Sequence, residues 1–191
     1  MKVILFGAAG TVGRGVLRQC LLDDRVTAVL AVGPAPTGVV HDRLREIVRA
    51  DLLDLAPVEA GLRGHDACFF CPGGPGRPRA AGETLARLNP GSAFVYVSGA
   101  RVDRATEEAL LALPLRSYVF RPGPVRQEGG GTARTGLHRL AYIVVRPLYP
   151  VLRRVLPATA TTPGQIGRAM ITVAERGAPR RVLGPADINA L

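Results

Sequence analysis

The sequence predicts an α/β protein in which a parallel sheet carries helices on both faces. Short apolar runs alternate with stretches whose apolar residues recur at helical spacing. The first apolar run leads directly into a glycine-rich turn. The 191 residues are enough to bury one sizeable core, so we expect a single domain over residues 1–191.

The predicted strands are short apolar runs, typical of parallel strands that are buried on both faces. They are residues 2–6, 26–32, 44–50 (the weakest pattern), 67–71, 93–97 and 117–120. A helix follows the first run, with Val12, Val16, Leu17 and Cys20 on one side. Residues 51–62 indicate a loop with a short helix, and further helices are expected around 80–89 and 103–112.

The pattern changes after the "RPGPV" segment. Residues 124–136 look like a loop, and an apolar stripe from Leu137 to Leu148 then recurs at helical spacing. A further helix is expected over 163–176, closed by Gly177, followed by a short strand in "RRVLG" and a last turn. We expect this C-terminal part, from about residue 124, to be a small helical segment that covers a pocket.

The first turn, "GAAGTVGRG", has the spacing of a dinucleotide-binding turn. Gly7, Gly10 and Gly13 follow a predicted strand and open a predicted helix. In such turns one glycine permits the tight bend, one lets the backbone approach a pyrophosphate, and one lets helix and strand pack closely. The free N–H groups and the dipole of the helix then favour phosphate. A glycine triplet alone is weak evidence, but its place in a βαβ pattern strengthens it.

The chain resembles atypical members of the short-chain dehydrogenase/reductase superfamily, in particular small NAD(P)-binding proteins of the NAD-dependent epimerase/dehydratase type. The resemblance spans nearly the whole chain. It is carried, in order, by "GAAGTVGRGVLRQCLLD", "EIVRADLLDL", "HDACFFCPG", "LARLNPGSAFVYVSGA", "YVFRPGPV" and "IGRAM". It implies a Rossmann-like, doubly wound parallel sheet in the strand order 3-2-1-4-5-6.

The resemblance also implies a set of cofactor contacts along the carboxyl ends of the strands. Asp51 and Leu52 would border the adenine, although a loop or helix-capping role suits Asp51 equally. Ser98 would lie near the nicotinamide, and Arg121, which has a surface role as its alternative, would help to close over the cofactor. The full implied set is Gly7, Gly10, Thr11, Val12, Gly13, Arg14, Asp51, Leu52, Cys71, Pro72, Gly73, Ser98, Arg121, Pro122 and Gly123.

The choice between NAD and NADP stays open at the sequence level. Relatives often carry an arginine after the second strand that can hold the 2′-phosphate of NADP, and Pro34 stands there in this chain. No acidic residue stands there to favour the 2′-hydroxyl of NAD. Arg14 and Arg43 are candidate replacements for the missing arginine.

The usual catalytic pair of the superfamily, YxxxK, is missing. The one lysine, Lys2, begins the first strand, and no tyrosine lies between Gly99 and Ser117. Ser98 remains as a group that could orient a carbonyl. His138 and Tyr142, four residues apart on one predicted helix, are candidate proton donors or exposed polar residues. Asp103 is a candidate base or a helix N-cap.

Charge and cysteine content bear on partners and location. Residues 112–191 carry 12 basic and 3 acidic side chains, which would favour an anionic small-molecule ligand or form only a solvated basic surface. No nucleic-acid motif accompanies the arginines, so we expect no nucleic-acid partner. We expect no membrane span and no signal peptide. The 137–148 stripe should pack against the sheet domain or against a second subunit, and we expect a homodimer. Three cysteines indicate a reducing, cytoplasmic setting, and "CFFC" favours core packing over redox work.

These features leave three functional hypotheses. The first is an oxidoreductase-like protein with a degenerate site, acting on a small carbonyl compound with water or His138 as proton donor. The second is a non-catalytic sensor of dinucleotides. The third is a non-redox isomerase or cyclase that reuses the pocket.

Overall fold

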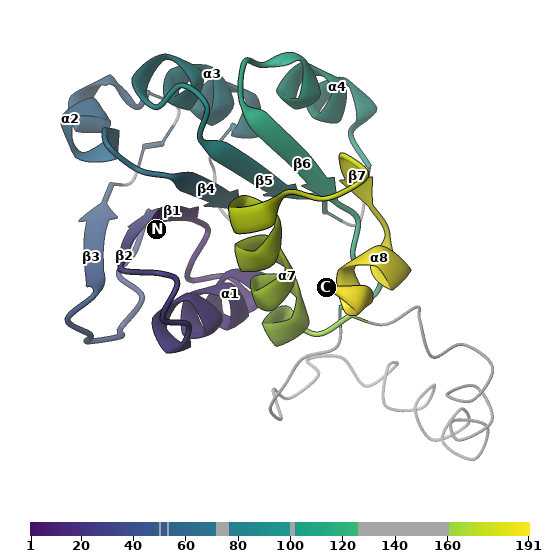
Figure 1. Cartoon of the computed structure of the whole chain (residues 1–191). Coiled ribbons are helices and arrows are strands. Elements are labelled where there is room, and N and C mark those ends of the chain that lie inside the picture. Colours follow the sequence, from purple (N-terminus) through teal and green to yellow (C-terminus); the bar gives the residue numbers. More distant parts are fainter. Residues whose placement is uncertain (50, 53, 72–76, 100–101, 126–160) are drawn as a thin grey trace, which may run out of the picture.

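Seven parallel strands form one sheet in the order β3-β2-β1-β4-β5-β6-β7 (Figure 1). The computed structural model describes residues 1–49, 51–52, 54–71, 77–99, 102–125 and 161–191. The strands are β1 (Lys2–Phe6), β2 (Ala28–Gly33), β3 (Leu44–Val48), β4 (Ala67–Phe70), β5 (Ala93–Val97), β6 (Arg116–Phe120) and β7 (Val182–Leu183). The predicted order of the first six strands is confirmed, and β7 extends the sheet beside β6.

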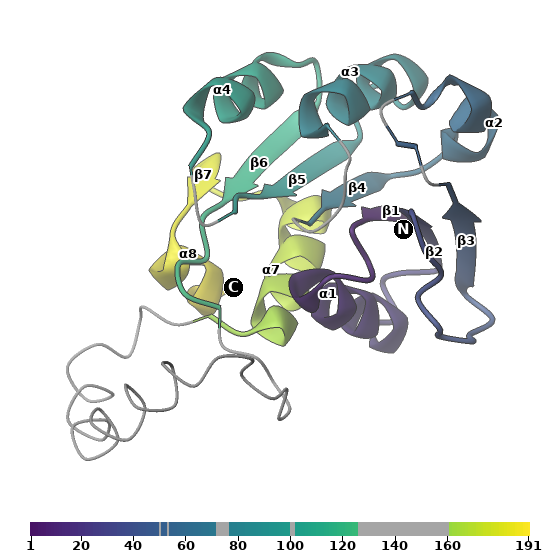
Figure 2. The same cartoon turned by 180° about the vertical axis from the view of Figure 1, so that it is seen from behind.

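The strands β1, β2, β4, β5 and β6 are largely buried because helices cover both faces of the sheet, whereas β3, at one end of the sheet, is more exposed. In β1, Val3 and Leu5 join the core on the face of α1 (Thr11–Leu22) and α7 (Pro163–Arg176), whereas Ile4 and Phe6 join the opposite core. That second face carries α2 (Glu59–Leu62), α3 (Pro78–Leu88) and α4 (Arg104–Ala112), as Figures 1 and 2 show. A 3-10 turn, η1 (Ala56–Val58), precedes α2, and α8 (Pro185–Ala190) follows β7.

Helix boundaries follow local capping chemistry. Asp103 caps α4, since its carboxylate accepts a hydrogen bond from the Thr106 backbone N–H at 3.2 Å. Thr162 and Gln165 form a reciprocal capping box at the start of α7, and Gly177 ends that helix at a φ of +78°. α1 begins at Gly10 without any side-chain cap, a difference that matters for the site.

Helices α1 and α7 approach closely because glycines face the contact. A Cβ on Gly15 would lie 2.8 Å from the carbonyl carbon of Pro163, and one on Gly167 would lie 3.1 Å from the Cα of Val16. Real Cβ atoms do not make contacts as short as the first of these, so alanine at Gly15 would force the two backbones apart. This packing fixes α1, and with it the glycine turn, against the sheet.

The three cysteines are core residues. Cys20, Cys68 and Cys71 are free thiols and buried. Cys68 belongs to the core under α3, whereas Cys20 and Cys71 belong to the core under α1. Burial raises the pKa of Cys20 to about 12 and raises those of Cys68 and Cys71 as well, which disfavours the reactive thiolate. The structure thus supports the core-packing interpretation of "CFFC".

Candidate functional site

Two of the three motif glycines are required by the shape of the turn. Gly7 has a φ of +77°, and a Cβ there would overlap the carbonyl oxygen of Cys71. A Cβ on Gly13 would lie 2.7 Å from the carbonyl carbon of Gly7 and 2.9 Å from the Cα of Ala8. The Gly10 N–H donates to the Gly7 carbonyl oxygen at 3.0 Å, which closes the turn. Gly7 and Gly13 therefore let β1, α1 and β4 approach one another.

Gly10 differs, because its backbone has no need of a glycine. Its φ of −73° and ψ of 166° are extended values that any residue adopts. It stands at the N-cap of α1, where no side chain accepts from the helix and the first turn holds no acidic residue. The N–H groups of Thr11, Val12 and Gly13 have no partner within the helix, and the positive end of the helix dipole adds to their attraction for an anion.

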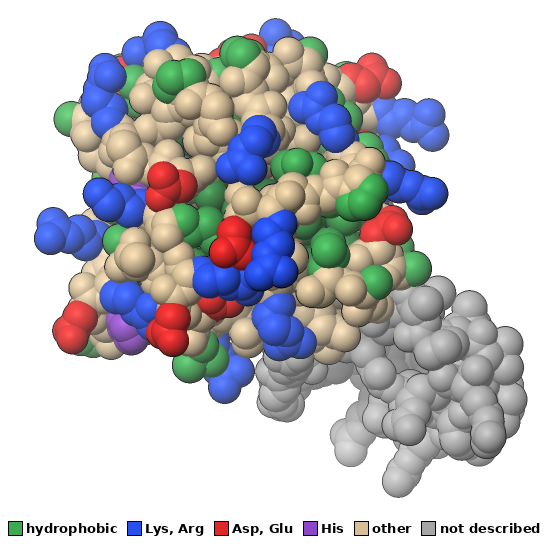
Figure 3. Space-filling model, viewed as in Figure 1, with side chains coloured by type: hydrophobic (Ala, Val, Ile, Leu, Met, Phe, Trp, Pro, Cys, Tyr) green, Lys and Arg blue, Asp and Glu red, His purple; other side chains and the backbone are tan. Residues whose placement is uncertain are grey.

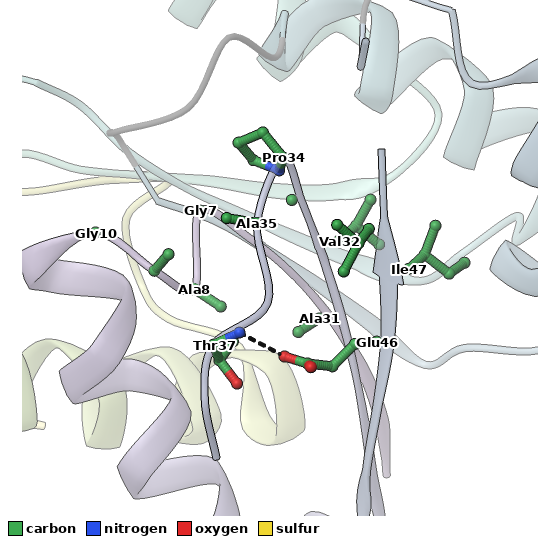
Figure 4. A pocket seen from close by; sticks show the side chains of 13 residues that line it. Gly7, Ala8, Gly10, Ala31, Val32, Pro34, Ala35, Thr37, Glu46 and Ile47 are labelled. Atoms are coloured by element: carbon green, nitrogen blue, oxygen red, sulfur yellow. Dashed lines mark hydrogen bonds between the residues drawn. The ribbon is translucent and has the colours of Figure 1, made fainter. Parts of the chain in front are cut away.

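A first pocket of about 120 Å³ opens beside this turn (Figure 4). Its lining comes from three chain segments: the glycine turn, the end of β2 with the residues after it, and β3. Gly7, Gly10, Gly33, Pro34 and Ile47 are among the lining residues. The pocket is mostly apolar, which suits a flat heterocycle lying between the ends of β2 and β3.

Among the described residues that line this pocket, Glu46 is the one with an acidic side chain. Its Oε1 accepts a hydrogen bond from the Thr37 backbone N–H at 2.8 Å, and Figure 4 shows the carboxylate turned toward Thr37. Glu46 faces the pocket from β3, opposite Ala31 in the register of β2. Glu46 lies within β3 and not directly after β2, so the sequence around the end of the second strand gave no sign of it.

A second pocket, of about 660 Å³, lies at the carboxyl ends of β5 and β6. Val12 of α1, Ser98, Arg121, Pro122 and Gly123 are among its lining residues. The structure thus brings together five residues that the resemblance implied for the cofactor and the reacting centre. Ligands of open parallel sheets bind outside the carboxyl ends of the strands, and both pockets lie there.

The hydroxyl of Ser98 is buried without a hydrogen-bond partner among the residues that the structure describes. Ser98 is 4% exposed and lines the second pocket. Its backbone is fixed, because its N–H donates to the Phe120 carbonyl oxygen at 2.8 Å. A buried hydroxyl that lacks a partner is costly unless a water molecule or a ligand completes it.

Arg121 forms a two-point ion pair with Glu107 of α4. Its Nε–H donates to Oε1 at 3.3 Å, and its Nη2 group donates to Oε2. The Glu107 side chain is 3% exposed and that of Arg121 is 40% exposed. Sequence reasoning missed Glu107, although an acid on the same helical face as Leu110 was a visible signal.

Other predicted contacts are less well placed or lie outside the described residues. Leu52 is buried in the core under α2 and α3, and neither it nor Asp51 is among the described lining residues of the first pocket, so their contact with adenine stays a prediction. Arg14 is exposed in the first turn of α1. Pro72, Gly73, His138 and Tyr142 lie outside the described residues, as does most of the segment expected to cover the pocket.

Two alternatives left open by the sequence are decided by the structure. Arg43, a candidate for holding the 2′-phosphate of NADP, is engaged elsewhere, because its guanidinium donates to the carbonyls of Leu21, Asp23 and Val26 at the C-terminal end of α1. Asp103 is the N-cap of α4, and hydrogen bonds from Thr106 lower the pKa of its carboxyl, which makes it a weak proton acceptor near neutral pH.

Searches for relatives find solved structures of the same fold but no sequence family. No protein-family model and no curated protein matches the chain. A Rossmann-fold NAD(P)-binding family protein from Shigella flexneri matches with 13% identity and a TM-score of 0.66, over 96% of this chain and 91% of that chain.

Two short-chain dehydrogenase/reductase proteins also match. The one from Burkholderia thailandensis, an oxidoreductase, has 17% identity and a TM-score of 0.59, over 100% of this chain and 93% of that chain. The one from Veillonella parvula has 12% identity and a TM-score of 0.63, over 96% and 92%. At these identities the likeness establishes the fold, a Rossmann-like parallel α/β sheet.

Proposed function

We propose that this protein binds a nicotinamide dinucleotide across the two pockets, with the pyrophosphate at the start of α1. The observation that carries the proposal is Gly10. It is a glycine at a backbone conformation open to any residue, at an uncapped helix N-terminus between two pockets. Close approach of a phosphate explains both the missing side chain and the free N–H groups.

The residues present fit such a cofactor along its length. The apolar first pocket suits the adenine, the N–H groups of Thr11, Val12 and Gly13 suit the pyrophosphate, and the second pocket suits the nicotinamide. Pro122 and Gly123 would border the nicotinamide end, and Cys71 would contribute its backbone near the ribose. A bound nicotinamide supplies a hydride to a carbonyl carbon or accepts one from an alcohol.

The charge of the first pocket favours NAD(H) over NADP(H). Glu46 faces the adenosine side, and a carboxylate there would repel a 2′-phosphate while it could accept a hydrogen bond from a 2′-hydroxyl. In this assignment the residue that selects the cofactor is Glu46 in β3, rather than a residue directly after the second strand.

We propose slow oxidoreductase chemistry on a small carbonyl compound as the activity. The unpartnered Ser98 hydroxyl would donate to the carbonyl oxygen and so orient it. The proton would come from water or from His138. A dinucleotide sensor is the second candidate function, because the usual catalytic lysine is missing. The chain's only lysine, Lys2, starts β1 at the end of the sheet opposite the pockets.

NADH fluorescence titration of the full chain tests the binding proposal. Gly10→Asp places a side chain and a negative charge against the phosphate position and is expected to abolish binding. Ala105→Asp is the matched control, since it adds the same charge in the exposed first turn of α4. Unchanged binding by Gly10→Asp would overturn the site. Steady NADH consumption with a panel of aldehydes and ketones then separates enzyme from sensor.

A further inference from the structure

Ser98 and Arg121 lie side by side at the carboxyl ends of the neighbouring strands β5 and β6. Val97 of β5 is paired with Phe120 of β6, and each of the two polar residues directly follows its strand. Neighbouring parallel strands are about 4.8 Å apart. Both residues line the second pocket, so one small molecule can contact them together.

Arg121 has hydrogen-bonding capacity beyond its ion pair with Glu107. A guanidinium carries five N–H donors, and Glu107 takes the Nε–H and one on Nη2. The remaining donors, both on Nη1 and the outer one on Nη2, have no partner among the described residues. Arg121 is also the one charged side chain among the described residues that line this pocket.

Glu107 acts as a positioning residue for that arginine. A buried carboxylate is costly unless it is paired, and the pair here is two-pronged, so Glu107 holds the guanidinium plane in one orientation. The unpaired edge of the guanidinium is thereby held in one place, and Arg121 is among the residues that line the second pocket. A planar oxyanion is the group that this edge matches best.

We propose that the second pocket binds small 2-oxo acids, with the carboxylate on the free edge of Arg121 and the adjacent carbonyl oxygen on the Ser98 hydroxyl. The two ligand oxygens are close together in such a compound, as are the two protein groups at the strand ends. The proposal rests on the proposed function in one respect only, namely that the bound acid is the carbonyl substrate. Binding itself requires no cofactor.

NMR chemical-shift titration of the full chain with two matched probes tests this assignment. Pyruvate carries the carboxylate, and pyruvamide is its neutral counterpart of similar shape. We expect pyruvate to bind about tenfold more tightly, as a charge-assisted hydrogen bond would give, with the largest shifts at Gly99 and Gly123. Equal binding of the two probes, or shifts elsewhere, would overturn the proposal.

The variants are chosen so that the fold survives. Arg121→Gln alone would strand a buried carboxylate, so the test uses R121Q/E107Q, which replaces the ion pair by two neutral amides. This double variant should lose the preference for pyruvate and keep its melting temperature within a few degrees. If the double variant retains the preference for pyruvate, the proposal is wrong and the Arg121–Glu107 ion pair serves only to hold α4 against β6. Ser98→Ala should weaken both probes alike, because both carry the carbonyl group.

The NADH titration distinguishes failure of this proposal from failure of the dinucleotide site. Pyruvate binding without NADH binding would refute the dinucleotide proposal and support the acid site. NADH binding with no preference for pyruvate would support the dinucleotide site and refute the acid site.

Discussion

At the scale of single residues, the three glycines of the first turn serve different purposes. Gly7 and Gly13 are excluded from carrying a side chain by neighbouring backbone, whereas Gly10 has an ordinary backbone conformation. The spacing in the sequence predicted the turn and its ligand class. It could not separate the three roles, because they depend on Cys71, directly after β4, and on the path of Ala8, which only the folded chain brings near.

Alanine substitutions should therefore split stability from binding. Gly13→Ala is expected to lower the melting temperature clearly, by an overpacking cost of about 1–3 kcal/mol or more. Gly10→Ala should cost less stability, because alanine adopts the extended backbone conformation of this N-cap residue without strain, and should weaken NADH binding. Thermal unfolding and NADH titration on the same samples check both. An equal loss of stability in the two variants would refute the distinction.

The Glu46 carboxylate should determine the choice of cofactor. Glu46→Gln keeps an oxygen that can accept from the Thr37 N–H and removes only the charge. We expect wild-type protein to bind NADH more tightly than NADPH, and the variant to gain NADPH affinity by about tenfold while NADH changes little. Parallel titrations with both cofactors measure this, and a variant with wild-type discrimination would show that Glu46 only ties the loop.

At the scale of elements, sequence patterns located most helices and strands but not their partners. The predicted helix over 163–176 is α7, yet its close contact with α1 through Gly15 and Gly167 has no local signature. Similarly, Glu107 was visible as an acid on an apolar helix face, but its pairing with Arg121 depends on how α4 packs beside β6. The strand order came from a family resemblance, since periodicity alone does not order a sheet.

The α1–α7 contact makes a sharp prediction. Gly15→Ala should destabilise the protein, because the gain in helix propensity of about 1 kcal/mol is smaller than the cost of a Cβ placed against the Pro163 backbone. Gly61→Ala is the matched control, since its Cβ would meet only the Cδ1 end of Ile47 at 3.1 Å. Urea unfolding should show a lower midpoint for the first variant and little change for the second.

At the scale of the whole molecule, stability should fall in mildly acidic solution. His65, between α2 and β4, is half-buried, and burial lowers its pKa; its Nδ1–H donates toward the carbonyls of Leu62 and Arg63. The unfolded chain then binds a proton more readily than the folded one. The free energy of unfolding therefore decreases as pH falls from about 6.5 toward the lower folded-state pKa.

Unfolding measurements at pH 7.5 and pH 5.5 (conditions set by the ordinary histidine pKa of about 6.5) check this dependence. His65→Gln should flatten it. A slope that persists in His65→Gln would assign the effect to other groups. The lowered pKa values of Asp23 and Asp103 affect stability only in more acidic solution.

Surface charge and assembly bear on the remaining expectations. Basic side chains are scattered among acidic ones on the face shown in Figure 3. Some charged side chains form ion pairs, among them Arg25 with Glu175. Within the described ranges, no helix is long and apolar enough to cross a membrane, and no cluster of metal-ligating side chains occurs. The homodimer, the cytoplasmic location and the absence of a nucleic-acid partner stay predictions. Analytical ultracentrifugation tests the dimer.

The most direct test of the dinucleotide site is backbone-amide NMR mapping during titration with NADH. The amides of Thr11, Val12 and Gly13 should shift most, because they face the phosphate position, with smaller shifts at Gly33, Gly99 and Gly123 along the two pockets. The amide resonances of α4, which lies on the face of the sheet opposite α1, should not shift. Shifts that leave the start of α1 untouched, or no shifts with NADH in large excess, would contradict the dinucleotide assignment.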